Sequence, residues 1–249
     1  MKRNHHTRSL LFLILSTTIL NLSAFAQSSA NTLDIVSWNV EYFGAPFNSG
    51  PTDKDLQEAN VKRVMRMINA DLYGMLEVVD SMRFRRLVDS LDRNEYGFVI
   101  APFCTGNTNG TGASWTSGQK TAFIYRKSIF SNVRTRGIMR NSSTGYTNWA
   151  SGRFPFMFSA TATINGISKD VNVILIHGKS GSTQSDYDKR FGAAQELKDS
   201  LDAQFNNTLN LIIGDYNDAL NTSIFTGATV SSYIPIVADS TDEIGRAHV

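Results

Sequence analysis

The spacing of apolar and polar residues along the chain predicts a protein built from both strands and helices. Alternating or continuous apolar runs rich in Val, Ile, Phe and Tyr are typical of strands. Such runs occupy residues 33–40, 71–78, 96–103, 120–126, 132–139, 154–164, 170–178 and 209–215. Helical spacing follows Thr52 and recurs at 81–93 and at about 184–205. Interleaved helices and strands with an antiparallel middle predict a layered α/β sandwich.

Two helices are given apolar faces by this spacing. Thr52 and Asp55 resemble a capping box at the start of the first helix. The residues expected to form its buried face are Leu56, Ala59, Val64, Met67 and Ile68. The residues expected to form the buried face of the long last helix are Phe191, Ala194, Leu197 and Leu201. The segment 105–118 is expected to be a polar loop.

The first 26 residues have the pattern of a signal peptide. Three basic residues precede an apolar run from Leu10 to Leu22, and Ala24-Phe25-Ala26 matches a cleavage site. The alternative, an uncleaved membrane anchor, is disfavoured because the run is short for a bilayer span. We therefore expect a secreted or periplasmic bacterial protein, without stable membrane association after cleavage. The remaining chain carries 21 basic and 22 acidic side chains, so it is not a polycation that binds nucleic acid by bulk charge.

The rest of the chain is expected to form one domain over residues 27–242, because no repeat or Pro-rich linker divides it. Its single cysteine, Cys104, has no His nearby in sequence and is interpreted as structural. The last six residues, Ile-Gly-Arg-Ala-His-Val, match the translation of a common sequencing adapter, and the less favoured alternative is a genuine short tail. We therefore expect residues 243–249 to be adapter-derived and the domain to be incomplete at its C-terminus, with its last strands missing.

Polar residues stand at the ends of four predicted strands. They are Asn39, Glu77, His177 and the pair Asp215 and Asn217. Any one of them is more often a turn residue or a structural histidine. Together they are chemically complementary, because sites are commonly built at strand ends and in the loops that follow.

The chemistry of this set favours metal-assisted hydrolysis of a phosphate ester. Carboxylate and amide oxygens suit Mg²⁺ or Mn²⁺. A second carboxylate can orient or deprotonate water, and a histidine or an amide can stabilise a phosphoryl oxygen. Zinc is disfavoured because there is one cysteine and no HExxH pair, and a serine triad because no GxSxG follows a strand.

Six short motifs resemble, in order, those of the deoxyribonuclease-I-like endonuclease/exonuclease/phosphatase superfamily. They are WNVEYFG, LEVVD, KTAFIYR, GRFPF, LIHGKSG and IIGDYND, between Leu33 and Asp218. The resemblance implies two packed, mainly antiparallel sheets flanked by helices. It implies that Glu77 and Asn39 bind the metal, that His177 and Arg153 contact the phosphate, that Asp215 positions the water and that Asn217 steadies the phosphoryl group. Asp218 and Tyr125 are left as structural support.

The chain departs from the family pattern at several positions. Leu76 stands where the family has glutamine before the metal glutamate, and Tyr216 where it has phenylalanine. The closing Ser-Asp-His segment has no match with the right spacing, so neither Asp242 nor His248 is assigned. We therefore predict that residues 27–249 alone are poorly active or inactive.

Three functions follow from the resemblance and the residues. The first is a secreted Mg²⁺-dependent or Mn²⁺-dependent phosphodiesterase, a nuclease with DNA or RNA as substrate. Such an enzyme would use a local basic groove, and the arginines that could form one are Arg134, Arg136, Arg140 and Arg153. The second is a sphingomyelinase-like phospholipase or a phosphomonoesterase, with Trp115 as the one loop aromatic suited to membrane contact. The third is a non-catalytic binding module.

Overall fold

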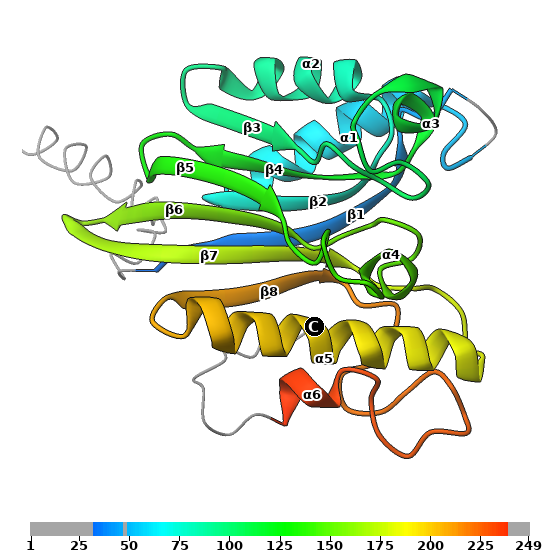
Figure 1. The fold of residues 1–249 in the computed structure, drawn as a ribbon. Helices are drawn as coiled ribbons and strands as arrows, with labels where there is room; N and C mark the ends of the chain where they lie inside the picture. Colours follow the sequence, from blue (N-terminus) through cyan, green and yellow to red (C-terminus); the bar gives the residue numbers. More distant parts are fainter. Residues whose placement is uncertain (1–31, 47–48, 239–249) are drawn as a thin grey trace, which may run out of the picture. The chain divides into compact units, whose positions relative to one another are not determined.

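This computed structural model describes residues 32–46 and 49–238, in which strands and helices are interleaved (Figure 1). In chain order they are β1 (Ile35–Phe43), α1 (Lys54–Ile68), β2 (Leu72–Val78), α2 (Ser81–Asp92), β3 (Tyr96–Ile100), α3 (Gly112–Ser117), β4 (Lys120–Arg126), β5 (Phe130–Gly137), α4 (Gly145–Asn148), β6 (Phe156–Ile164), β7 (Ile167–His177), α5 (Gln184–Phe205), β8 (Leu209–Asp215) and α6 (Ile234–Val237). The predicted signal peptide and the adapter-like residues 243–249 lie outside this part. None of the helices described here is long and apolar enough to cross a bilayer.

The strands form two four-stranded sheets, ordered β1-β2-β4-β3 and β5-β6-β7-β8. Each sheet has one parallel pair at one edge, β1 with β2 and β7 with β8. The other neighbours pair antiparallel. The prediction of a layered α/β sandwich with two mainly antiparallel sheets is confirmed.

Two apolar clusters hold the layers together. In the first, Phe43 and Ala122 of the β1–β4 sheet pack with Val61 of α1 and Phe84 of α2. The second fills the space between the sheets, where the rings of Phe123 and Phe158 lie 5.2 Å apart. It continues beyond the second sheet to the buried face of α5 (Figure 1). Burial of this apolar surface on both faces of each sheet is the main favourable term for the fold.

Helix α1 buries a different face from the one that its apolar residues predicted. Leu56, Met67 and Ile68 are 55%, 77% and 49% exposed, so the predicted face was wrong. The buried residues are Gln57, Val61 and Met65. The cap is also one residue later than predicted, because the Asp53 carboxylate accepts the hydrogen bond from the Leu56 N–H.

Other elements differ from the sequence-based expectation in smaller ways. On α5, Ala194, Leu197 and Leu201 are buried as predicted, whereas Phe191 is 37% exposed because it stacks on Tyr187 at the surface. Strand β3 ends at Ile100, before the predicted end at Phe103. The segment expected to be a loop contains α3, a short helix over Gly112–Ser117.

A buried lysine fastens α3 to the end of the first sheet. Lys120 is 1% exposed. Its Nζ donates hydrogen bonds to the carbonyl oxygens of Val79 at 2.8 Å, Gly118 at 2.9 Å and Thr116 at 3.3 Å. The same atom lies 4.6 Å from the centre of the Trp115 ring, which gives the predicted loop aromatic an internal partner. Burial lowers the pKa of Lys120 to about 8.

This lysine makes stability depend on pH in a defined window. Between about pH 8 and the ordinary value of 10.5, the unfolded chain binds more protons at Lys120 than the folded chain, so stability rises with pH. The difference corresponds to about 3 kcal/mol. We expect the stability of wild type relative to Lys120→Met to increase by about that amount from pH 7.5 to 10.5, measured by urea unfolding at both pH values. The comparison cancels tyrosine ionisation, and equal pH slopes for the two proteins would contradict the prediction.

Candidate active site

The predicted site residues meet at one edge of the two sheets. Asn39 is the last residue of β1 in regular register with β2, just before the irregularity that ends at Phe43, and Glu77 is the last but one residue of β2. His177 and Asp215 end the parallel strands β7 and β8 and are paired in register. Strand β8 contacts both β1 and β2, so the ends of the two parallel pairs face each other. Each sheet thus contributes half of the site.

The amide of Asn39 connects the two halves. Its Nδ2 donates to Glu77 Oε1 at 3.1 Å and to Asp215 Oδ2 at 3.0 Å. Its Oδ1 accepts the hydrogen bond from the Glu41 N–H at 3.0 Å. One neutral side chain therefore lies between two carboxylates, and it holds them close together by charge-assisted hydrogen bonds.

The backbone is strained where it carries these side chains. Glu77 has a φ of 61° and Asn217 a φ of 50°, both in the left-handed region. The bulge after Asn39 places Glu41 and Tyr42 there as well, with φ of 48° and 49°. The Tyr42 N–H of this bulge donates to Glu77 Oε2 at 3.1 Å. Such conformations cost about 1–3 kcal/mol each and gather at functional sites.

His177 is neutral and is paired with Arg153. The Arg153 Nη1 lies 2.8 Å from His177 Nε2, which accepts the hydrogen bond because the guanidinium can only donate. The same Nε2 lies 3.7 Å from Glu77 Oε1 and 3.9 Å from Asp215 Oδ2. Burial, followed by the positive charge of Arg153, lowers the pKa of His177 to about 3. The imidazole therefore stays uncharged at neutral pH, and Arg153 supplies the positive charge.

The carbonyl of Gly178 gathers the other polar groups. It accepts hydrogen bonds from Arg153 Nη2 at 3.2 Å and from Asn217 Nδ2 at 3.1 Å. The Asn217 N–H donates to Asp215 Oδ1 at 3.0 Å. The buried Nε of Arg153 has no hydrogen-bond partner among the described residues. Arg153 and Asn217 are therefore oriented by one carbonyl, and Arg153 keeps a donor free.

Gly214 permits the close approach that places Asp215. Its φ is 144°, and a Cβ there would lie 1.9 Å from the carbonyl oxygen of Ile176 on β7. Only glycine fits this backbone beside the neighbouring strand. The residue before Asp215 is therefore fixed by geometry.

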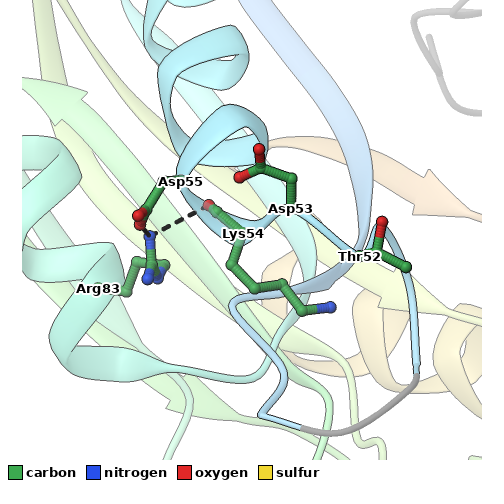
Figure 2. Close-up of a pocket in the computed structure, with 5 residues that line it drawn as sticks. All are labelled: Thr52, Asp53, Lys54, Asp55 and Arg83. Carbon is green, nitrogen blue, oxygen red and sulfur yellow. Dashed lines mark hydrogen bonds and ion pairs between the residues drawn. The ribbon is translucent and has the colours of Figure 1, made fainter.

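An open hollow of about 840 Å³ lies beside Asp215. It is lined by Ser37, Asn39, Leu76, Gly214 and the segment from Asp215 to Asn221, together with Ile224. Figure 2 shows a second hollow, at the start of α1, where Arg83 donates to Asp55 and to the Lys54 carbonyl. The second hollow is lined by none of the predicted site residues. The first is lined by Asn39, Asp215 and Asn217 but not by Glu77, Arg153 or His177, so it adjoins one part of the candidate site.

The donor set fits a hard divalent cation. Glu77 and Asp215 offer carboxylate oxygens. The Glu77 side chain is 13% exposed and the Asp215 side chain is 31% exposed. Within the described residues there is no group of three or more His, Cys, Asp or Glu side chains that could hold a metal ion by itself. Mg²⁺ is commonly held by only one or two carboxylates, with water and substrate phosphate completing its shell. Cys104 is buried away from this set, with its Sγ toward the Ser114 carbonyl.

A buried ion pair beneath the site was missed in the sequence. Arg190 and Asp218 have fully buried side chains, with Arg190 Nε and Nη2 both 3.3 Å from Asp218 Oδ2. Arg190 Nη1 donates to the carbonyls of Lys179 and Gly181, in the loop after His177. Asp218 directly follows Asn217. The sequence did contain a signal for this pair. Arg190 falls on the same face of α5 as the apolar residues, and a buried charge there requires a partner.

Comparisons with known proteins agree with this architecture. No family model and no curated protein matches the sequence. A *Bacteroides thetaiotaomicron* mannosyl-6-phosphatase is 14% identical with a TM-score of 0.55, over 83% of this chain and 70% of that one. A *Bacteroides vulgatus* endonuclease/exonuclease/phosphatase is 16% identical with a TM-score of 0.55, over 84% and 71%.

A humanised *D. rerio* TDP2 with 14 mutations gives a TM-score of 0.50 at 14% identity. The match covers 76% of this chain, which spans 64% of the length of that protein. The chain has the fold of the deoxyribonuclease-I-like endonuclease/exonuclease/phosphatase proteins. The resemblance inferred from the six motifs is thus confirmed at the level of the fold.

Proposed function

We propose that this protein is an exported, divalent-metal-dependent phosphoester hydrolase that cleaves phosphodiesters of DNA or RNA. One observation carries the proposal: Asn39 holds the carboxylates of Glu77 and Asp215 together, within 4 Å of the His177 ring that Arg153 contacts. Negative oxygen ligands thus lie beside a buried cation. A phosphate ester needs both, a metal for its charged oxygens and donors for the oxygens that the metal does not contact.

Each residue has a distinct task in this proposal. Glu77, with the remaining lone pair of Asn39 Oδ1, would hold Mg²⁺ or Mn²⁺, which neutralises charge on the phosphate when bound. Asp215 accepts a proton from the attacking water, since its carboxylate is the more exposed of the two. Arg153 and Asn217 donate to phosphoryl oxygens. His177 keeps Arg153 aligned through its unprotonated Nε2.

The substrate class is the finer part of the proposal. Three of the four arginines considered for a basic groove have internal contacts. Arg153 donates to the Gly178 carbonyl, Arg136 lies over the Phe205 ring, and Arg140 donates to the Thr108 carbonyl. A phosphomonoesterase is therefore the second candidate, and the structural likeness to a mannosyl-6-phosphatase favours it. Both candidates share the same attack on phosphorus and differ in the leaving group.

A substrate panel tests the proposal. The gene would be recovered from an independent clone up to its natural stop codon, and both that product and the chain from Gln27 to Val249 would be assayed. We expect Mg²⁺-dependent or Mn²⁺-dependent cleavage of plasmid DNA or single-stranded RNA by the recovered product, abolished by EDTA, and little by the shorter chain. Preferential release of phosphate from mannose 6-phosphate would establish the second candidate. Metal binding without hydrolysis of any ester, sphingomyelin included, would indicate a binding module.

A further inference from the structure

Gln57 is a buried polar residue to which the proposed mechanism gives no task. It lies on the first turn of α1, on the stripe that includes Val61 and Met65, and it is 8% exposed. A buried amide is costly unless its donors and acceptor find partners. Its partners therefore indicate why a glutamine stands where the helix otherwise buries apolar side chains.

The side-chain hydrogen bonds of Gln57 go to residues 40–44, a segment that contains the bulge of β1 and the residue that follows the strand. Its Nε2 donates to the carbonyl oxygens of Val40 at 2.8 Å and Glu41 at 2.9 Å. Its Oε1 accepts the hydrogen bond from the Gly44 N–H at 3.1 Å. The pairing of β1 with β2 shifts register between Asn39 and Phe43, so the bulge interrupts the regular ladder there. One side chain thus holds both ends of the bulge.

The same bulge orients the metal half of the site. Its Tyr42 N–H donates to Glu77 Oε2, and its Glu41 N–H donates to Asn39 Oδ1. Glu41 and Tyr42 present these N–H groups from a left-handed conformation, which is unfavourable for both residues. The conformation persists only where surrounding contacts fix it. Gln57 supplies three such contacts from the other side of the segment.

We propose that Gln57 is a positioning residue for the metal site. It fixes the β1 bulge so that the backbone N–H groups of Glu41 and Tyr42 hold Asn39 and Glu77 in the geometry that binds a divalent cation. The inference rests on the proposed function in one respect, that Glu77 binds the metal. Groups that orient ligands in this way typically change metal affinity by 10- to 100-fold when removed.

The test separates positioning from general stabilisation of α1. Gln57→Met keeps the volume and removes all three hydrogen bonds, while Gln57→Glu keeps the acceptor for Gly44. Val61→Ala is the matched control, because Val61 is buried one turn later on the same helix and packs into the apolar cluster. Each full chain would be expressed with its own leader, and Mn²⁺ affinity would be measured from free Mn²⁺ by electron paramagnetic resonance.

We expect Gln57→Met to bind Mn²⁺ about 10-fold or more weakly than wild type. Gln57→Glu should also weaken binding, because its second oxygen would face the carbonyl oxygens of Val40 and Glu41. Val61→Ala should lower the melting temperature without changing Mn²⁺ affinity. The amide of Tyr42 should exchange with solvent faster in Gln57→Met and not in Val61→Ala. Unchanged Mn²⁺ affinity in Gln57→Met, or an equal loss in Val61→Ala, overturns the positioning role. Absence of Mn²⁺ binding by wild type would contradict the proposed function and not the positioning role. In that case the Tyr42 amide decides, and an unchanged exchange rate in Gln57→Met would overturn the positioning role.

Discussion

Replacing Glu77 with glutamine is expected to reduce metal-dependent hydrolysis by on the order of 10³-fold, because the loss of several kcal/mol of charge stabilisation gives that factor. The substitution keeps the size of the side chain and an oxygen for the Tyr42 N–H. It removes the negative charge that attracts the cation. Initial rates over a range of Mg²⁺ concentrations would show whether the loss is recovered at high metal, as expected for weakened binding.

Glu41 provides the control for this experiment. It is the neighbouring carboxylate on the β1 bulge, and its side chain is exposed. Glu41→Gln removes the same charge from the same segment and should change the rate less than about 3-fold, since a surface charge acts weakly through solvent. Full activity in Glu77→Gln, with an unchanged circular dichroism spectrum, would place the metal elsewhere.

Replacing Asp218 with asparagine is expected to destabilise the fold by about 3–5 kcal/mol, the usual cost of breaking a buried ion pair. Arg190 would keep its positive charge in a site from which water is excluded. The new amide would also direct N–H groups at donors, since Asp218 accepts hydrogen bonds from Ser223 Oγ and the Ile224 N–H. Urea unfolding at pH 7 measures the change.

Two variants make this result specific. Asp89→Asn breaks the pair of Asp89 with Arg93, whose side chains are 40% and 71% exposed, and should cost less than about 1 kcal/mol. The double change Arg190→Met with Asp218→Leu should be less destabilising than Asp218→Asn alone, because no buried charge remains. A loss below about 1 kcal/mol in Asp218→Asn would contradict the assignment of a buried, coupled pair.

The sequence predicted the strands well because most of them carry a continuous or alternating apolar pattern that the layers require, although β5 is largely polar and exposed. It failed on the face of α1 for a physical reason. Apolar residues such as Leu56 and Met67 suggested one face, but the helix packs with Gln57 inward because the β1 bulge needs hydrogen-bond partners. That requirement arises from the tertiary structure and leaves no apolar signal in the helix.

The candidate site was predictable in its side chains and not in its backbone. Glu77, His177 and Asp215 stand at or next to strand ends, Asn39 stands where the regular ladder of β1 stops, and parallel pairing brings such positions together. Two backbone groups orient these side chains, the Tyr42 N–H and the Gly178 carbonyl. Almost every residue carries such groups, so the sequence does not reveal which of them do so. Their positions depend on left-handed residues and loop contacts that form only in the folded chain.

Because the candidate site is divided between two sheets, its geometry depends on how the two sheets pack together. Asn39 spans that division with a single amide, and the separation it spans is set by rings such as Phe123 and Phe158 in the interior. Protein interiors are close-packed and transmit small changes in volume as displacements. Laboratory evolution of the proposed activity would therefore be expected to find activity-altering substitutions deep in the core, away from the candidate site.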